Sequence, residues 1–120
     1  MGRLSVDRYL AWRFHIVRCN CWAPVRAGWL ELTGVDLGEL TPADISTDAL
    51  KARFDSQRPR FRLLERPADP SIVLMMTPGM IPHVGLYHRR KVLQMTEGGG
   101  SYMPLATATA GWRKVEFYIP

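Results

Sequence analysis

Residues 82–94 read PHVGLYHRRKVLQ, and this stretch decides the fold class of the chain. Val84 and Leu86 alternate with other residues at the period of two that is typical of a half-buried strand. A polar tip at residues 88–91 is followed by a second apolar segment. The pattern predicts an antiparallel hairpin in which His83 lies on the face opposite to Val84 and Leu86.

Further strands are expected on both sides of this hairpin. Residues 72–76 form a short, continuous apolar run, which is consistent with a buried strand. Val115, Phe117 and Ile119 alternate as a last strand. The glycines at residues 98–100 lack the lysine and the strand-to-helix context of a phosphate-binding loop, so we interpret them as a flexible connection.

The first half of the chain has helical rather than strand periodicity. An apolar stripe over residues 6–14 predicts a short helix. A second helix is expected over residues 21–33, with Asn20 as its N-cap and Gly34 as the left-handed residue that ends it. Pro24 is tolerated only in a first helical turn, which places the helix start close to Cys21.

Two more helical segments are expected, a turn near residues 41–44 and a short helix over residues 47–54. Helices followed by strands are typical of an α+β fold. We therefore predict a single domain spanning residues 1–120, with N-terminal helices packed on a C-terminal antiparallel sheet.

Composition narrows the function classes. Apolar residues make up 47% of the chain and charged residues 22%, as in an ordinary globular protein. The net charge of +5 favours acidic partners without choosing among them. The basic residues at 58–66 and 89–91 are not interleaved with aromatics in a recognisable nucleic-acid motif, which argues against nucleic acid as the partner. The longest apolar run is too short to span a bilayer and residues 1–10 contain no secretion signal, so synthesis in the cytoplasm is expected.

Cys21 is the first candidate for chemistry. A cysteine at a helix N-terminus meets unpaired amides and the positive end of the helix dipole, which favour the nucleophilic thiolate. The competing interpretation is a buried, structural cysteine. Cys19 is separated from Cys21 by one residue, which is unsuited to a disulfide and to common zinc spacings, so we expect no metal and no cofactor.

His83 is the candidate base, since a histidine at the start of a strand can lie over a helix terminus. Gln94 is on the partner strand, where its amide oxygen is expected to accept a hydrogen bond from the second ring nitrogen of His83. Trp22, next to the nucleophile, is expected to line a substrate cleft. The other two histidines, His15 and His88, are interpreted as surface polar groups.

Five segments together resemble the NlpC superfamily of papain-like cysteine peptidases, in particular small phage members associated with tail tips. The segments are NCW at 20–22, IVLM at 72–75, HVGLY at 83–87, VLQM at 92–95 and WRKVEFY at 112–118. The resemblance implies a papain-like fold with Cys21 as nucleophile, His83 as base and Gln94 where the family often has a second histidine. Asn20 stands where the family usually has an aspartate.

The resemblance also implies a substrate and a setting. The substrate would be a peptide amide of peptidoglycan, and the location would be the virion tail, acting at the host cell wall after synthesis in the host cytoplasm. Other tail-tip or hub proteins would be its partners. The alternative is a mainly structural tail-tip component with a peptidase-like fold and little activity.

Overall fold

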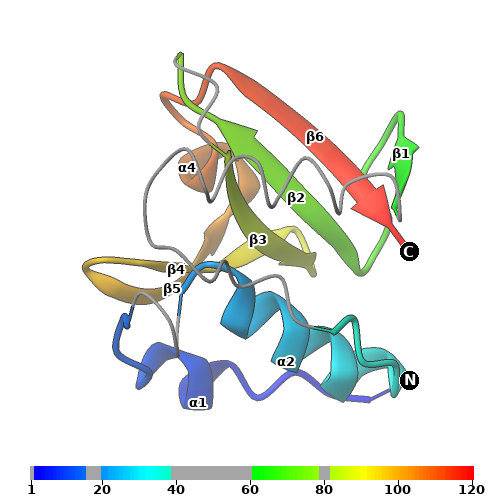
Figure 1. The fold of residues 1–120 in the computed structure, drawn as a ribbon, viewed down its shortest axis with the longest axis vertical. Coiled ribbons are helices and arrows are strands. Elements are labelled where there is room, and N and C mark those ends of the chain that lie inside the picture. The colour runs from blue at the N-terminus through cyan, green and yellow to red at the C-terminus, as the bar shows by residue number, and fades with distance from the viewer. Residues whose placement is uncertain (1, 16–19, 39–60, 79–81) are drawn as a thin grey trace.

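An antiparallel sheet of six strands, in the order β1-β6-β2-β3-β4-β5, is the framework of the described part of the chain (Figure 1). The computed structural model describes residues 2–15, 20–38, 61–78 and 82–120. The helical segments expected at residues 41–44 and 47–54 lie outside the described residues. The strands are β1 (Arg62–Leu64), β2 (Ser71–Met76), β3 (Pro82–His88), β4 (Lys91–Thr96), β5 (Gly99–Pro104) and β6 (Lys114–Ile119).

The helices divide between the two faces of this sheet. Helices α1 (Val6–Leu10) and α2 (Trp22–Thr33) lie together against one face, and α4 (Leu105–Ala108) lies against the other (Figure 1). The prediction of an α+β domain with N-terminal helices on a C-terminal antiparallel sheet is thereby confirmed for the described residues. None of the described helices has the length and apolar character needed to cross a membrane.

Two apolar clusters, one on each face, explain why every residue of β2 is buried. The first cluster lies between the sheet and α1 and α2, and the second lies between the sheet and α4. Successive β2 residues alternate between them, because neighbouring side chains of a strand point to opposite faces. The first cluster takes Ile72, Leu74, Met76, Val84, Leu86 and Leu93 from the sheet, and the second takes Val73, Met75 and Val92.

Helix α2 begins and ends as its sequence predicts. Pro24 lies in the first turn, where its missing N–H costs no helical hydrogen bond. Gly34 closes the helix in the left-handed region with φ 78°. Helix α1 is shorter than the predicted stripe and ends at Leu10. The carboxylate of Glu31 holds α1 against α2, because it accepts hydrogen bonds from Ser5 and from the hydroxyl of Tyr9.

The β3–β4 hairpin is confirmed, and so is its alternation of faces. Its turn consists of Arg89 and Arg90, both with positive φ. Two other predictions were wrong. Gly99 and Gly100 begin strand β5, which pairs with β4, instead of forming a loop. His88 is 8% exposed and lies 2.6 Å from the carboxylate of Asp69, so it is not a surface group.

Candidate functional site

His83 is the second residue of β3, and its imidazole is held by Gln94 of β4. The Nε2 atom of His83 lies 2.8 Å from Oε1 of Gln94. An amide oxygen only accepts hydrogen bonds, so Nε2 donates the proton and Nδ1 carries the free lone pair. The contact expected between His83 and Gln94 is present in the structure. The tautomer that results leaves Nδ1 as the basic atom of the ring.

Trp112, which sequence reasoning did not select, packs on the same imidazole. The two ring centroids are 5.2 Å apart and the ring planes differ by 7°, which is a stacked arrangement. Met75 of β2 pairs with His83 on one side and with Val115 of β6 on the other. The stacking of Trp112 on His83 could not be predicted from the sequence, because the sequence does not show that β6 lies beside β2.

Cys21 is the N-cap of α2, and its sulfur contacts the strand that carries His83. Backbone hydrogen bonds from Cys21 itself and from Val84 stabilise the thiolate form of this side chain. The N–H of Val84 belongs to the peptide bond that joins His83 to Val84. The fold therefore brings the candidate nucleophile to the main chain of the candidate base.

The ladder between β3 and β4 explains why this amide is available to the sulfur. That ladder pairs the end of β3, Leu86 to His88, with the start of β4, and the first residues of β3 extend beyond it. The side chain of Val84 enters the first cluster beside α2. The imidazole of His83 packs against Trp112, which belongs to the second cluster. Sulfur and imidazole thus approach the same peptide unit from different sides of β3.

Burial controls the protonation of both groups. It raises the pKa of the Cys21 thiol, and the two backbone hydrogen bonds oppose this shift only in part. It lowers the pKa of His83, against the hydrogen bond to Gln94, which raises it. Both shifts favour uncharged groups, so the resting pair is a thiol and a neutral imidazole. The position of Cys21 at a helix N-terminus predicted a thiolate. In the structure, the loss of hydration on burial has a larger effect on the pKa of the thiol than the helix N-terminus has.

Trp22 has a different place from the one expected. Its side chain is 4% exposed, its indole N–H donates to the carbonyl of Gly38 at 2.8 Å, and its ring meets Phe61 edge to face. Trp22 therefore packs in the first cluster, whereas the sequence predicted a residue lining a cleft. Its backbone N–H donates to the side chain of Asn20 at 3.0 Å, but the N-cap of α2 is Cys21, one residue after the predicted Asn20, because the helix begins at Trp22.

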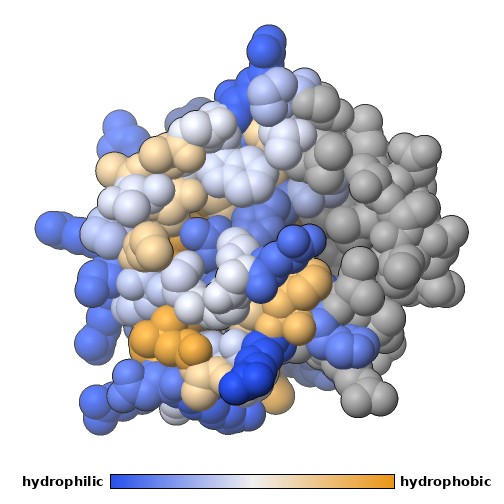
Figure 2. Space-filling model, turned by 90° about the vertical axis from the view of Figure 1, so that its left-hand side faces the viewer, coloured by the Kyte–Doolittle hydropathy of each residue, from blue (hydrophilic) through white to orange (hydrophobic). Residues whose placement is uncertain are grey.

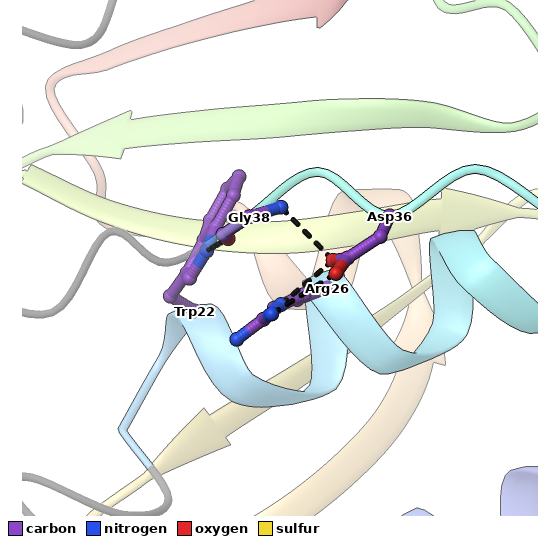
Figure 3. Close-up of polar contacts among 4 residues, drawn as sticks. All are labelled: Trp22, Arg26, Asp36 and Gly38. Atoms are coloured by element: carbon purple, nitrogen blue, oxygen red, sulfur yellow. Dashed lines mark hydrogen bonds and ion pairs between the residues drawn. The ribbon is translucent and has the colours of Figure 1, made fainter.

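The segment after α2 is fixed beside Trp22 by one ion pair (Figure 3). Nε of Arg26 lies 2.8 Å from Oδ1 of Asp36, and the same carboxylate accepts the N–H of Gly38. These hydrogen bonds, Arg26 first, lower the pKa of Asp36 to about 2. The carbonyl that binds the Trp22 indole is held in place by this arrangement.

Two hollows lie elsewhere on the described surface. One, of about 840 Å³, lies between the N-terminal segment and the β3–β4 turn, beside Tyr102. The other, of about 400 Å³, lies between residues 10–14 and 97–100. Both are lined by residues other than Cys21, His83 and Gln94. On the side seen in Figure 2, hydrophilic residues surround separate apolar patches.

The remaining candidate chemistry is limited. His15 is exposed, and Cys19 lies outside the described residues. Within the ranges that the structure describes, no three side chains of His, Cys, Asp or Glu gather into a group that could hold a metal ion. Comparisons with protein-family models, with curated proteins and with solved structures gave no match.

Proposed function

We propose that this protein is a cysteine hydrolase with a papain-like fold of the NlpC type, which cleaves peptide amides of peptidoglycan. Cys21 is the nucleophile, His83 the base and Gln94 the residue that orients the base. One observation carries the proposal. Gln94 holds the Nε2 proton of His83 and leaves Nδ1 free, while Cys21 lies at the N-terminus of α2, where the backbone amides of Cys21 and Val84 lower the pKa of its thiol against the effect of burial.

The reaction starts from the uncharged pair. The sulfur and the imidazole approach β3 from different sides, so this reaction requires the imidazole to reach the sulfur around the first residues of β3. As the sulfur attacks the amide carbon, the thiol proton then passes to Nδ1 of His83, and a backbone N–H such as that of Cys21 stabilises the oxyanion. The carbon–nitrogen bond then breaks, and the imidazolium gives its proton to the leaving amine. Water attacks the thioester, His83 takes a proton from it, and the acid leaves as the cysteine regains its proton.

The resemblance of the five segments supports the substrate class and the setting. A tail-associated enzyme would reach the cell wall on the virion, next to other tail-tip or hub proteins, after synthesis in the host cytoplasm. The net charge of +5 agrees with a polymer substrate that carries acidic groups.

A digestion experiment tests the proposal. Purified peptidoglycan is incubated with the protein, and new amine and carboxyl ends are identified by mass spectrometry. Cys21→Ser and His83→Gln should each lower the rate by roughly 1000-fold or more, because a nucleophile and its base act as one unit. Cys19→Ser is the matched control and should retain activity. Cleavage that persists in Cys21→Ser would contradict the proposal.

The alternative function is a structural component of a phage tail tip that has the fold and little activity. Two observations favour it: burial raises the pKa of the Cys21 thiol, and Trp22 packs in the core. A structural role requires neither thiol chemistry nor a cleft. It predicts that wild-type protein leaves peptidoglycan intact, and that Cys21→Ser associates with tail proteins as well as wild type does.

A further inference from the structure

Backbone hydrogen bonds of Trp112 and of the next residue hold Trp112 in place. Its own N–H donates to the carbonyl of Thr109 at 3.3 Å, in the turn that follows α4. The next residue, Arg113, donates its N–H to the carbonyl of Met76 at 3.0 Å, at the end of β2. The indole also packs against the second apolar cluster. Its backbone and its ring therefore have defined positions beside β2.

The hydrogen bond to Gln94 alone does not determine the orientation of the His83 ring. A single bond at Nε2 fixes one atom, and the ring can still tilt about that contact. The indole of Trp112 lies parallel to the imidazole within 7°, so it restricts the plane of the ring. The two contacts come from different elements, β4 for Gln94 and the α4–β6 connection for Trp112. Together they define both the direction of Nε2 and the plane that contains Nδ1.

We propose that Trp112 is the positioning residue of His83: its indole holds the plane of the imidazole and keeps water from one face of the ring. The role in catalysis rests on the proposed function, whereas the contact itself does not. The lowered pKa of His83, caused first by burial, agrees with a ring covered in this way. Trp112 acts through His83 and is not itself a group that reacts.

Tyr87 provides a matched control in the same cluster. It lies on the same face of β3 as His83, and it packs against the second cluster, as Trp112 does. Its ring meets Phe117 edge to face, with centroids 6.1 Å apart. Removing the ring of Tyr87 therefore loosens this cluster without removing the ring that stacks on His83.

The experiment follows the titration of His83 by NMR of the imidazole carbon-bound protons, assigned with His83→Gln. Trp112→Leu should raise the pKa of His83 toward the ordinary value of about 6.5, because water then reaches the exposed face. Trp112→Phe keeps an aromatic ring and should stay close to wild type, as should Tyr87→Leu. In hydrolysis, Trp112→Leu should lower kcat about 10-fold with KM unchanged, and Trp112→Phe should restore most of it.

The outcomes separate the two proposals. An identical His83 titration in wild type and Trp112→Leu would overturn the role of Trp112, whether or not the protein hydrolyses peptidoglycan. An equal shift of the His83 pKa in Tyr87→Leu would also overturn the role of Trp112, because looser packing of the second cluster would then explain the shift. If the titration moves as expected and wild-type protein shows no hydrolysis, the contact stands and the proposed function fails. If Trp112→Leu does not fold, Trp112→Met replaces it, because methionine also lacks the ring and should raise the pKa of His83, whereas an unchanged titration in Trp112→Met would overturn the role of Trp112.

Discussion

The Nε2 atom of His83 and the Oε1 atom of Gln94 lie 2.8 Å apart, and this bond joins β3 to β4 beyond the end of their ladder. Gln94→Ala should lower turnover roughly 10- to 100-fold and leave the fold intact, because the ring loses an orienting contact. It should also lower the pKa of His83 further, since the bond to Gln94 raises it.

Gln94→His is the matched control for that change. A neutral histidine still offers a ring nitrogen as acceptor, and a second histidine is common at this position in the family that the sequence resembles. It should recover much of the turnover lost in Gln94→Ala. Steady-state kinetics and circular dichroism of the three proteins provide the measurement. Turnover in Gln94→Ala equal to that of wild type would mean that Gln94 does not orient the ring.

Alkylation of Cys21 should have a pH midpoint above that of an ordinary thiol, which is about 8.5. Burial raises its pKa, and only the thiolate reacts with iodoacetamide. Labelling is measured by mass spectrometry across pH in a Cys19→Ser background, so that Cys21 alone reacts. The same protein in urea is the control, and its midpoint should return to the ordinary value. A native midpoint below that of the unfolded chain would instead favour a thiolate–imidazolium pair.

The hairpin and helix α2 could be predicted because their signals are local. The alternation around Val84 and Leu86 needs only neighbouring residues, and Gly34 marks the helix end by its own conformational freedom. The contact between His83 and Gln94 followed from the hairpin, since one turn places both residues on one face. The candidate catalytic residues were therefore accessible to sequence reasoning.

Other features depend on partners that are distant in sequence. Strand β5 has little apolar alternation, and it forms along the free edge of β4 with Tyr102 packed against the first cluster. The stack of Trp112 on His83 requires that β6 lie beside β2. The pKa of Cys21 also depends on its burial at the helix terminus, and an argument from the helix dipole takes no account of burial.

The protein should lose stability as the pH falls below the ordinary histidine value of about 6.5, in part because of His83. Its folded pKa is lowered, by burial first, so the unfolded chain takes up a proton before the folded one does. The contribution of neutral His83 to stability is present above the pKa of His83 in the unfolded chain. It is lost as the pH falls through the pKa of His83 in the folded protein. Urea unfolding at several pH values between about 8 and 5 measures how steeply the free energy of unfolding changes with pH. This dependence should be weaker in His83→Gln. Equal slopes in the two proteins would contradict the burial of His83.

Alanine should destabilise the protein at Gly100 and leave its stability nearly unchanged at Gly98. A Cβ on Gly100 would lie 2.4 Å from the carbonyl oxygen of Tyr9, which is backbone and cannot rotate away. A Cβ on Gly98 would meet only the hydroxyl of Thr96, at an ordinary 3.6 Å. Gly100→Ala should therefore destabilise the protein by about 1–3 kcal/mol, as overpacking does, by pushing α1 from β5. Gly98→Ala should change stability by no more than about 0.5 kcal/mol.

Urea unfolding followed by tryptophan fluorescence measures both changes, and the difference between the two variants is the informative quantity. Both substitutions remove the same flexibility from the unfolded chain, so that contribution cancels in the comparison. The remaining difference in stability reports how closely β5 packs against the main chain at the end of α1. A destabilised Gly100→Ala beside a neutral Gly98→Ala would support the close approach of these two elements. Equal stability of both variants would mean that the chain at Gly100 is further from Tyr9 than the structure places it.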